Sequence, residues 1–350
     1  MRGPLILTFS IVTAINSLFS TALTSPPPWG KSLSMRACWV FPMIVLLASG
    51  CGRKQVRATP KAVALREDGV IALQVATFNL RYENDGDKGR RAWRERIRPV
   101  IGTISRMSPD VFGIQEGLHG MMADLRASLT DYGFHGIGRD DGKREGEYSG
   151  IFYRNDRFEP DLTDAGTFWL SDTPETPGSK TWGNTIPRIA AWIRLTDRAT
   201  GRGFYVFNTH WDHQNQPSRE GAAKLITARI DGRRHRDEPV VLVGDFNAIE
   251  DNPAVGYLRG KPATLMGQPS KWEHALVDSY NALHPNDQNR TTLHFWQGSR
   301  AGTRCVDHIL VQPGTRILMA DIVADPEPLP SDHFPVYARI EFPLASSAAR

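Results

Sequence analysis

The stretch Pro239-Val-Val-Leu-Val-Gly-Asp-Phe-Asn-Ala248 decides how this chain is organised. Residues 240–243 are apolar and mostly β-branched, which predicts a buried strand. Gly244 then lets the backbone turn, so that Asp245 and Asn247 emerge where a sheet meets solvent. Ends of central strands often carry functional sites, because the sheet is rigid and the loops beyond it can converge. An isolated Asp-x-Asn is more often a simple turn, so the interpretation depends on the rest of the chain.

Polar side chains of similar chemistry occur in or beside several other predicted strands. They are Asn79, Glu116, His210, Asp307 and the pair Asp332-His333. A single residue of this kind is usually a turn former or a satisfied surface group. Together they supply carboxylate oxygens suited to Mg²⁺, amides that can orient water or phosphate, and histidines that can exchange protons. The set contains the ingredients of metal-assisted phosphoester hydrolysis.

The hydrophobic pattern predicts a strand-rich domain with a few helices. Besides 240–243, strands are predicted over residues 70–80, 111–114, 150–154, 187–192, 204–208, 304–311 and 336–340. Amphipathic helices are predicted over residues 92–108, 121–129 and 218–234, and a long loop over 168–184. The sequence has no internal repeat and no long linker after residue 70. We therefore expect one domain over residues 70–345, built from two stacked sheets covered by helices.

The charge of the chain is unevenly distributed. The formal net charge is +4 and the pI is near 9.0, which invites a nucleic-acid interpretation. Eight of the 42 basic residues but only two of the 38 acidic residues precede residue 70, so the remainder carries a formal charge of about −2. The basicity belongs to the N-terminal segment and is no argument for DNA or RNA binding.

The N-terminal segment has the pattern of an export signal. An apolar run over 5–23 is interrupted by polar residues, and a second run over 38–48 has the length of a signal-peptide core. Arg36 supplies a positive start, and Leu47-Ala-Ser-Gly-Cys51 resembles a bacterial lipobox. We expect residues 1–50 to be a dispensable leader and lipoprotein-type signal peptide, with Met35 as the true start.

By this interpretation Cys51 becomes the lipidated first residue of an exported lipoprotein, held on the periplasmic or cell-surface side of a membrane. Residues 51–69 are then a basic tether. The alternatives are an uncleaved anchor, or small residues that precede Cys51 by chance. After processing, Cys305 is the one thiol left besides Cys51, which excludes a disulfide framework and a cysteine-based zinc site.

The ordered motifs resemble the endonuclease/exonuclease/phosphatase superfamily, which has the deoxyribonuclease-I-like fold. They are Phe78-Asn-Leu-Arg81, Gln115-Glu-Gly117, Asn208-Thr-His210, Gly244-Asp-Phe-Asn247, Val306-Asp-His-Ile309 and Ser331-Asp-His333. The resemblance covers about residues 72–343 and is nearest to the nocturnin/deadenylase-like branch and its bacterial secreted members. It implies an α+β fold, a four-layer α/β/β/α sandwich of two mixed sheets flanked by helices.

The resemblance also implies roles for the site residues. Asn79, Glu116 and Asp307 would hold Mg²⁺, for which Mn²⁺ is a substitute. The catalytic residues would be His210, Asp245, Asn247, Asp332 and His333. Asp245 would activate the attacking water with Asn247 as its aligner, and Asp332 would orient His333.

Weaker matches concern substrate binding. The expected substrate-binding residues are Arg139, Glu147, Arg188, Trp211, Asp212 and His213. A surface ion pair is an equal alternative for Glu147 and Arg188. His308 stands where many members of the family have Tyr, and packing beside the sheet is its simplest role.

The functional expectation is a Mg²⁺-dependent phosphodiesterase that cleaves nucleic-acid-type phosphodiesters, either as an endonuclease or as a 3′–5′ exonuclease. Its partners would be RNA or DNA as substrate and a membrane through Cys51, with no protein partner. The alternative is a phosphomonoesterase or a phospholipid or sugar-phosphate hydrolase with the same site, because these activities share one scaffold. A binding lipoprotein without catalysis is the contrasting class, and the intact set of acidic and histidine residues disfavours it.

Overall fold

The computed structural model describes residues 69–324 and 328–342. The expected leader over 1–50, the lipidation residue Cys51 and the tether up to residue 68 lie outside these ranges. Within them, no helix combines the length and the apolar character needed to cross a membrane.

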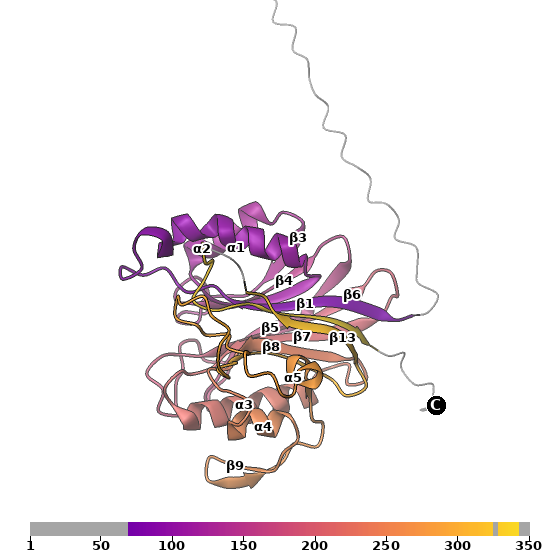
Figure 1. Ribbon diagram of the computed structural model, residues 1–350. Helices are drawn as coiled ribbons and strands as arrows, with labels where there is room; N and C mark the ends of the chain where they lie inside the picture. Colours follow the sequence, from indigo (N-terminus) through magenta and orange to yellow (C-terminus); the bar gives the residue numbers. More distant parts are fainter. Residues whose placement is uncertain (1–68, 325–327, 343–350) are drawn as a thin grey trace, which may run out of the picture. The chain divides into compact units, whose positions relative to one another are not determined.

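Two six-stranded sheets form the body of the molecule (Figure 1). The first sheet has the order β13 (Arg316–Ile322), β14 (Val336–Phe342), β1 (Ile71–Asn79), β2 (Val111–Gly117), β4 (Tyr148–Arg154) and β3 (Tyr132–His135). The second has the order β11 (Val277–Asp278), β12 (Asp307–Val311), β8 (Val240–Asp245), β7 (Gly203–His210), β6 (Ile189–Asp197) and β5 (Phe158–Trp169). Each sheet contains one parallel pair, β1 with β2 and β7 with β8, so both are mixed.

Helices cover the outer face of each sheet. Helices α1 (Trp93–Met107) and α2 (His119–Ser128) lie over the first sheet, and α3 (Gln216–Asp231) and α4 (Pro253–Leu258) over the second (Figure 1). A 3₁₀ turn (Gly89–Arg91), helix α5 (Ser279–Leu283) and the hairpin of β9 (Ala263–Leu265) and β10 (Gln268–Ser270) complete the order. The arrangement confirms the expected α+β four-layer sandwich.

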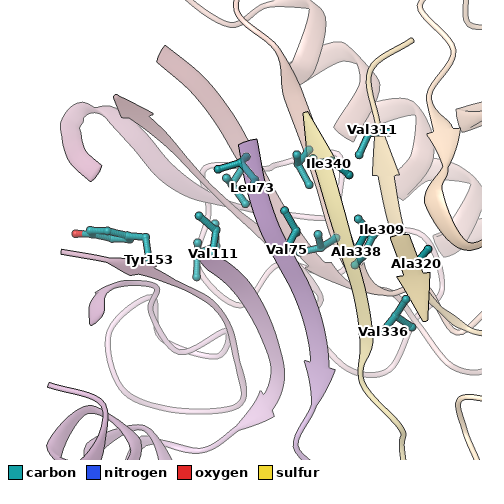
Figure 2. Close-up of a cluster of buried hydrophobic side chains, with 14 of the residues drawn as sticks. Leu73, Val75, Val111, Tyr153, Ile309, Val311, Ala320, Val336, Ala338 and Ile340 are labelled. Atoms are coloured by element: carbon teal, nitrogen blue, oxygen red, sulfur yellow. The ribbon is translucent and has the colours of Figure 1, made fainter. Parts of the chain in front are cut away.

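The largest apolar cluster fills the space between the two sheets. Leu73, Val75 and Val111 face it from the first sheet, and Ile309 and Val311 from the second (Figure 2). All five side chains are buried. Because side chains alternate along a strand, the opposite faces of these strands pack under the helices in two further clusters.

The sequence pattern misses the short strands β9, β10 and β11 and three longer strands, β3, β5 and β13. These three longer strands lie at sheet edges. Strand β5 is polar over 159–164 and its pairing register shifts between Asp161 and Ala165, which breaks the alternation. It also ends at Trp169, inside the expected loop over 168–184.

The stretch 239–248 forms the central strand β8 and the turn beyond it. Gly244 has φ +152°, and a Cβ atom there would lie 2.1 Å from the carbonyl oxygen of Thr209 on β7. Only glycine allows this close approach of two strands. Asp307, expected within a strand, is instead the first residue of β12 and pairs with Asp245 in register.

Candidate active site

Adjacent strand ends place the site residues in one row. In the second sheet, His210 pairs with Asp245, and Asp245 pairs with Asp307. In the first sheet, Asn79 ends β1 and Glu116 lies near the end of the neighbouring β2. The two sheets meet here, because Nδ2 of Asn79 lies 2.9 Å from Oδ2 of Asp245.

Asn79 connects two carboxylates through its side-chain amide. Its Nδ2 donates to Oε1 of Glu116 at 3.0 Å and to Oδ2 of Asp245 at 2.9 Å. Its Oδ1 already accepts the backbone N–H of Arg81 at 2.9 Å. The amide nitrogen faces the acids and the amide oxygen accepts a backbone N–H, so the expected role of Asn79 as a metal ligand stays a prediction.

Glu116 is the carboxylate that faces the cleft. It has φ +62°, an unusual left-handed conformation for a residue with a side chain. Its Oε2 accepts the backbone N–H of Tyr82 at 3.0 Å, and its side chain is only half-buried. The carboxylate is fixed in direction and open to a ligand.

His333 is oriented by Asp307, which corrects the expected partnership with Asp332. Nδ1 of His333 lies 2.9 Å from Oδ2 of Asp307, and both residues are buried. The Asp332 carboxylate instead lies 3.8 Å from the guanidinium of Arg81 and lines the cleft. The sequence places Asp332 beside His333, but the fold brings Asp307 across from another strand.

Asp245 stands between the two histidines. Its Oδ2 lies 3.5 Å from Nε2 of His210 and 3.9 Å from Nε2 of His333, and its Oδ1 accepts the backbone N–H of Asn247 at 2.8 Å. Asn247 has φ +45°, and its Nδ2 donates to Nε2 of His210 at 2.9 Å and to the carbonyl of Trp211. His210 therefore accepts at Nε2 and carries its proton on Nδ1.

The surroundings separate the pKa values of these groups. Burial and the carboxylate of Asp307 raise the pKa of Asp245. Burial lowers the pKa of His210 to about 3, and the nearby Arg188 adds to the shift. Burial would also lower the pKa of His333, but the charge and hydrogen bond of Asp307 outweigh it and raise the pKa to about 10. The site thus holds one neutral and one charged imidazole.

Cationic side chains form the opposite wall of the cleft. Arg139 donates two hydrogen bonds to Glu147, at 2.6 and 2.8 Å. Arg188 is buried and lies beside His213, with Nη2 of the arginine 3.0 Å from Nδ1 of the histidine. The Asp212 side chain stands behind them and accepts backbone N–H groups of the loop that follows. The alternative of a surface ion pair therefore fits neither Glu147 nor Arg188, because the Glu147–Arg139 pair lies inside the cleft and Arg188 is buried.

Trp211 was expected to contact substrate, and this expectation is wrong. Its side chain is 0% exposed and stacks on Phe246, with ring centroids 4.4 Å apart. It belongs to the apolar cluster between the second sheet and its helices. A tryptophan next to a site histidine in sequence faces the opposite side of the strand.

His308 has a more defined role than packing. Its Nδ1 lies 2.8 Å from Oδ2 of Asp278, the N-cap of α5, and its Nε2 lies 2.9 Å from the carbonyl oxygen of Ala248. Both of its nitrogens thus face acceptors, and its ring also packs on Phe246. His308 ties the turn after β8 to another element.

These groups line one cleft with a volume of about 610 Å³. It contains Glu116, Arg139, Glu147, Arg188, His210, His213, Asp245, Asn247, Asp332 and His333. The sequence interpretation missed five further lining residues, Arg81, Tyr82, Ile186, Leu293 and Phe295. Arg81 belongs to the Phe-Asn-Leu-Arg motif, so a signal existed, whereas nothing in the sequence singles out Leu293.

The donor set fits a divalent cation. Glu116, His210 and Asp245 each offer a ligand atom, and these atoms lie within 4.8 Å of one another, as do those of Asp245, Asp307 and His333. Several carboxylates this close together in a buried site repel one another unless a cation lies between them. The oxygen-rich composition suits a hard ion.

The fold and this site define a hydrolase that acts on phosphoesters. The chain belongs to the Endonuclease/Exonuclease/phosphatase family, whose family model matches residues 76–333. Enzymes of this family are divalent-metal dependent, as the carboxylate and histidine cluster leads one to expect.

Solved structures agree with this membership. An endonuclease/exonuclease/phosphatase from Bacteroides vulgatus is 34% identical with a TM-score of 0.69, over 78% of this chain and 99% of that one. A mannosyl-6-phosphatase from Bacteroides thetaiotaomicron is 32% identical with a TM-score of 0.67, over 77% and 100%. The human nocturnin catalytic domain, 15% identical with a TM-score of 0.58 over 77% and 95%, shares the fold. No curated protein gives a significant match.

Proposed function

We propose that this chain is a divalent-metal-dependent phosphatase that hydrolyses phosphomonoesters of small polyhydroxy compounds, of the sugar-phosphate kind. The observation that carries the reaction is the row of Glu116, Asp245, Asp307 and the two histidines at one cleft. The 32% identical protein named as a mannosyl-6-phosphatase supports the substrate class. Residues 70–350 carry a formal charge of about −2, which gives no added attraction for a polyanion such as DNA or RNA.

The reaction is the attack of water on phosphorus. Water forms a new P–O bond, the ester P–O bond breaks, and the proton released by the water balances the one taken up by the leaving alcohol, so that inorganic phosphate and the alcohol result. Glu116 would hold the ion, with the negative charge of Asp332 nearby, and a bound divalent ion supplies charge stabilisation at the phosphoryl oxygens.

The residues around the reacting phosphorus have separate tasks. Asp245 accepts the proton of the attacking water, since its raised pKa makes it a better base than an exposed carboxylate. Asn247 and the Nδ1–H of His210 orient the water and the phosphoryl group. His333, kept charged by Asp307, stabilises the negative charge that develops on phosphoryl oxygens.

A nucleic-acid-type phosphodiester is the second candidate, and one observation favours it. Phe295 is 53% exposed on the lining of the cleft, and Arg304 lies over its ring at 5.1 Å. Exposed aromatic rings beside a cation commonly stack on nucleobases, although they also stack on sugar rings.

A substrate screen tests the proposal. Protein truncated before residue 52 is incubated with sugar phosphates, nucleotides, phospholipid headgroup esters and single-stranded RNA and DNA, with and without EDTA. We expect release of phosphate from sugar phosphates, which EDTA abolishes. Asp245→Ala and His333→Ala should each lower turnover by about 100-fold or more. EDTA-resistant turnover would contradict metal dependence, and cleavage of nucleic acid alone would favour the second candidate.

We also propose that the protein is exported and anchored by a lipid on Cys51. The lipobox-like Leu47-Ala-Ser-Gly-Cys51 and the preceding apolar run support this localisation. Palmitate labelling of wild type and Cys51→Ala tests it. Label in the wild type alone is expected, and equal label in both, or none, would exclude the anchor.

A further inference from the structure

Arg188 is a buried cation whose hydrogen-bonding capacity is largely unused. The residue is 3% exposed and lies on the wall of the cleft, just before β6. Its Nε and Nη1 atoms are buried and have no hydrogen-bond partner among the described residues. The closest carboxylate oxygen with which it pairs, Oδ2 of Asp212, lies 3.8 Å from Nε, beyond hydrogen-bond distance.

A second buried arginine shows what a structural role looks like in this fold. Arg96 of α1 is also fully buried, but its nitrogens donate to the carbonyl oxygens of Leu80, Arg81, Arg91 and Pro330 at 2.6–2.9 Å. Buried donors without acceptors are costly, so a purely structural arginine is satisfied in this way. Arg233 and Arg290, which do not line this cleft, each leave only Nε without an acceptor within the described ranges, whereas Arg188 leaves two nitrogens unused. These two unused donors indicate an acceptor that comes from outside the chain.

Two histidines beside Arg188, His213 and His210, also line the cleft and indicate where such an acceptor would bind. A guanidinium only donates, so Nδ1 of His213 accepts from Nη2 of Arg188, and the Nε2 of His213 carries a proton. The Nδ1 of His210 is likewise buried and makes no hydrogen bond within the described part of the chain; Oε2 of Glu147 lies 3.6 Å away. Arg139 is held by Glu147, which leaves Arg188 as the cation least compensated by hydrogen bonds on this wall.

We propose that Arg188 binds a terminal phosphoryl oxygen and thereby selects phosphomonoesters over phosphodiesters. This inference rests on the proposed phosphatase function and specifies its substrate class. A monoester has three terminal oxygens and two negative charges, so one oxygen would remain for Arg188 if a bound ion and His333 each held one. In a diester that third position is an ester oxygen, which bears no charge and carries a carbon group.

A pair of matched substrates tests the selection. Wild type, Arg188→Met and Arg188→Lys are compared on p-nitrophenyl phosphate and on bis(p-nitrophenyl) phosphate. Hydrogen bonds to charged groups contribute enough that kcat/KM of Arg188→Met should fall about 100-fold for the monoester. For the diester we expect a fall of less than about 5-fold. Arg188→Lys should lose about 10-fold on the monoester, because it keeps the charge but not the planar group.

The control is Arg194→Met, at the other end of β6. Arg194 is half-buried and bonded to Glu238, remote from the cleft, so both substrates should react at wild-type rates. An equal loss of both activities in Arg188→Met would overturn the proposal. If circular dichroism shows that this variant does not fold, Arg188→Lys and Arg188→Gln carry the same comparison.

Binding of inorganic phosphate separates this inference from the proposed function. Calorimetry should show an affinity about 30-fold weaker in Arg188→Met than in wild type, and unchanged in Arg194→Met. A wild type that hydrolyses neither substrate would end the proposed function, yet the phosphate measurement would still decide whether Arg188 binds a phosphoryl group. Equal affinities in wild type and Arg188→Met would exclude it.

Discussion

Two buried side chains, Asp307 and His333, determine the charge of the site. Their hydrogen bond of 2.9 Å joins β12 to the loop before β14 and keeps the imidazole protonated. Asp307→Asn keeps the shape but removes the charge, so the pKa of His333 should fall from about 10 towards 6.5 and kcat should fall about 100-fold or more. NMR titration of the metal-free protein and kinetics on one monoester measure the two effects.

Asp332→Asn is the matched comparison for that experiment. Asp332 is the sequence neighbour of His333, but its carboxylate lies near Arg81 instead. The larger drop in the pKa of His333 should therefore occur in the Asp307 variant. A larger drop in the Asp332 variant would restore the pairing that the sequence suggested.

His294 should make the protein sensitive to mild acid. Burial lowers its pKa to about 4, its ring packs against Phe334 with the ring centroids 4.0 Å apart, and its Nδ1 accepts the N–H of Gly298. Between pH 6.5 and about 4 the unfolded chain binds a proton here that the folded chain does not, so stability falls as pH falls through this window.

His294→Phe should remove this contribution and keep the ring contact. The free energy of unfolding should then fall less between pH 7 and pH 4 than it does in wild type. Urea unfolding at several pH values measures the difference. Parallel pH profiles for the two proteins would contradict the assignment.

At the scale of elements, His308 holds the turn after β8 against the start of α5. It bridges Asp278 and the carbonyl of Ala248, one residue beyond Asn247. His308→Leu should release this turn and displace Asn247, so kcat should fall about 10- to 100-fold while KM changes little. His308→Gln, which can still bond one acceptor, should recover part of the loss.

A stability control distinguishes positioning from general damage. Leu265→Ala, in the buried apolar layer near β9, should lower the free energy of unfolding by about 2–5 kcal/mol and leave kcat unchanged. If His308→Leu and Leu265→Ala both lose kcat in proportion to their loss of stability, His308 has no positioning role.

The central strands could be predicted from the sequence, and the edge strands could not. Strand β8 has four consecutive buried apolar residues, whereas β13 leaves Leu318 and Met319 exposed and β5 contains a register shift. The site residues were recognisable because each lies at or near an end of a strand with a strong apolar pattern. Their partners were not, since the pairing of Asp307 with His333 and the burial of Trp211 depend on register and strand face, which only the fold determines.

At the scale of the whole molecule, the site joins the two sheets. Glu116 comes from the first sheet and Asp245 from the second, and Asn79 donates a hydrogen bond to each. The acidic groups repel one another across this junction in the absence of a cation. An ion bound there therefore stabilises the packing of one sheet on the other, as well as the reacting phosphate.

Metal binding should consequently raise the thermal unfolding midpoint of the entire domain. A divalent ion at about 100 times its Kd adds about 2.7 kcal/mol, which corresponds to about 5–10 °C for a domain of this size. Scanning calorimetry with EDTA, Mg²⁺ or Mn²⁺ measures the shift and identifies the preferred ion. Glu116→Gln should lose most of it, because the carboxylate open to the cleft is removed. Glu273→Gln, an exposed acid paired with Lys271, should keep it in full. A shift of equal size in the Glu116 variant would mean that the ion binds elsewhere on the protein.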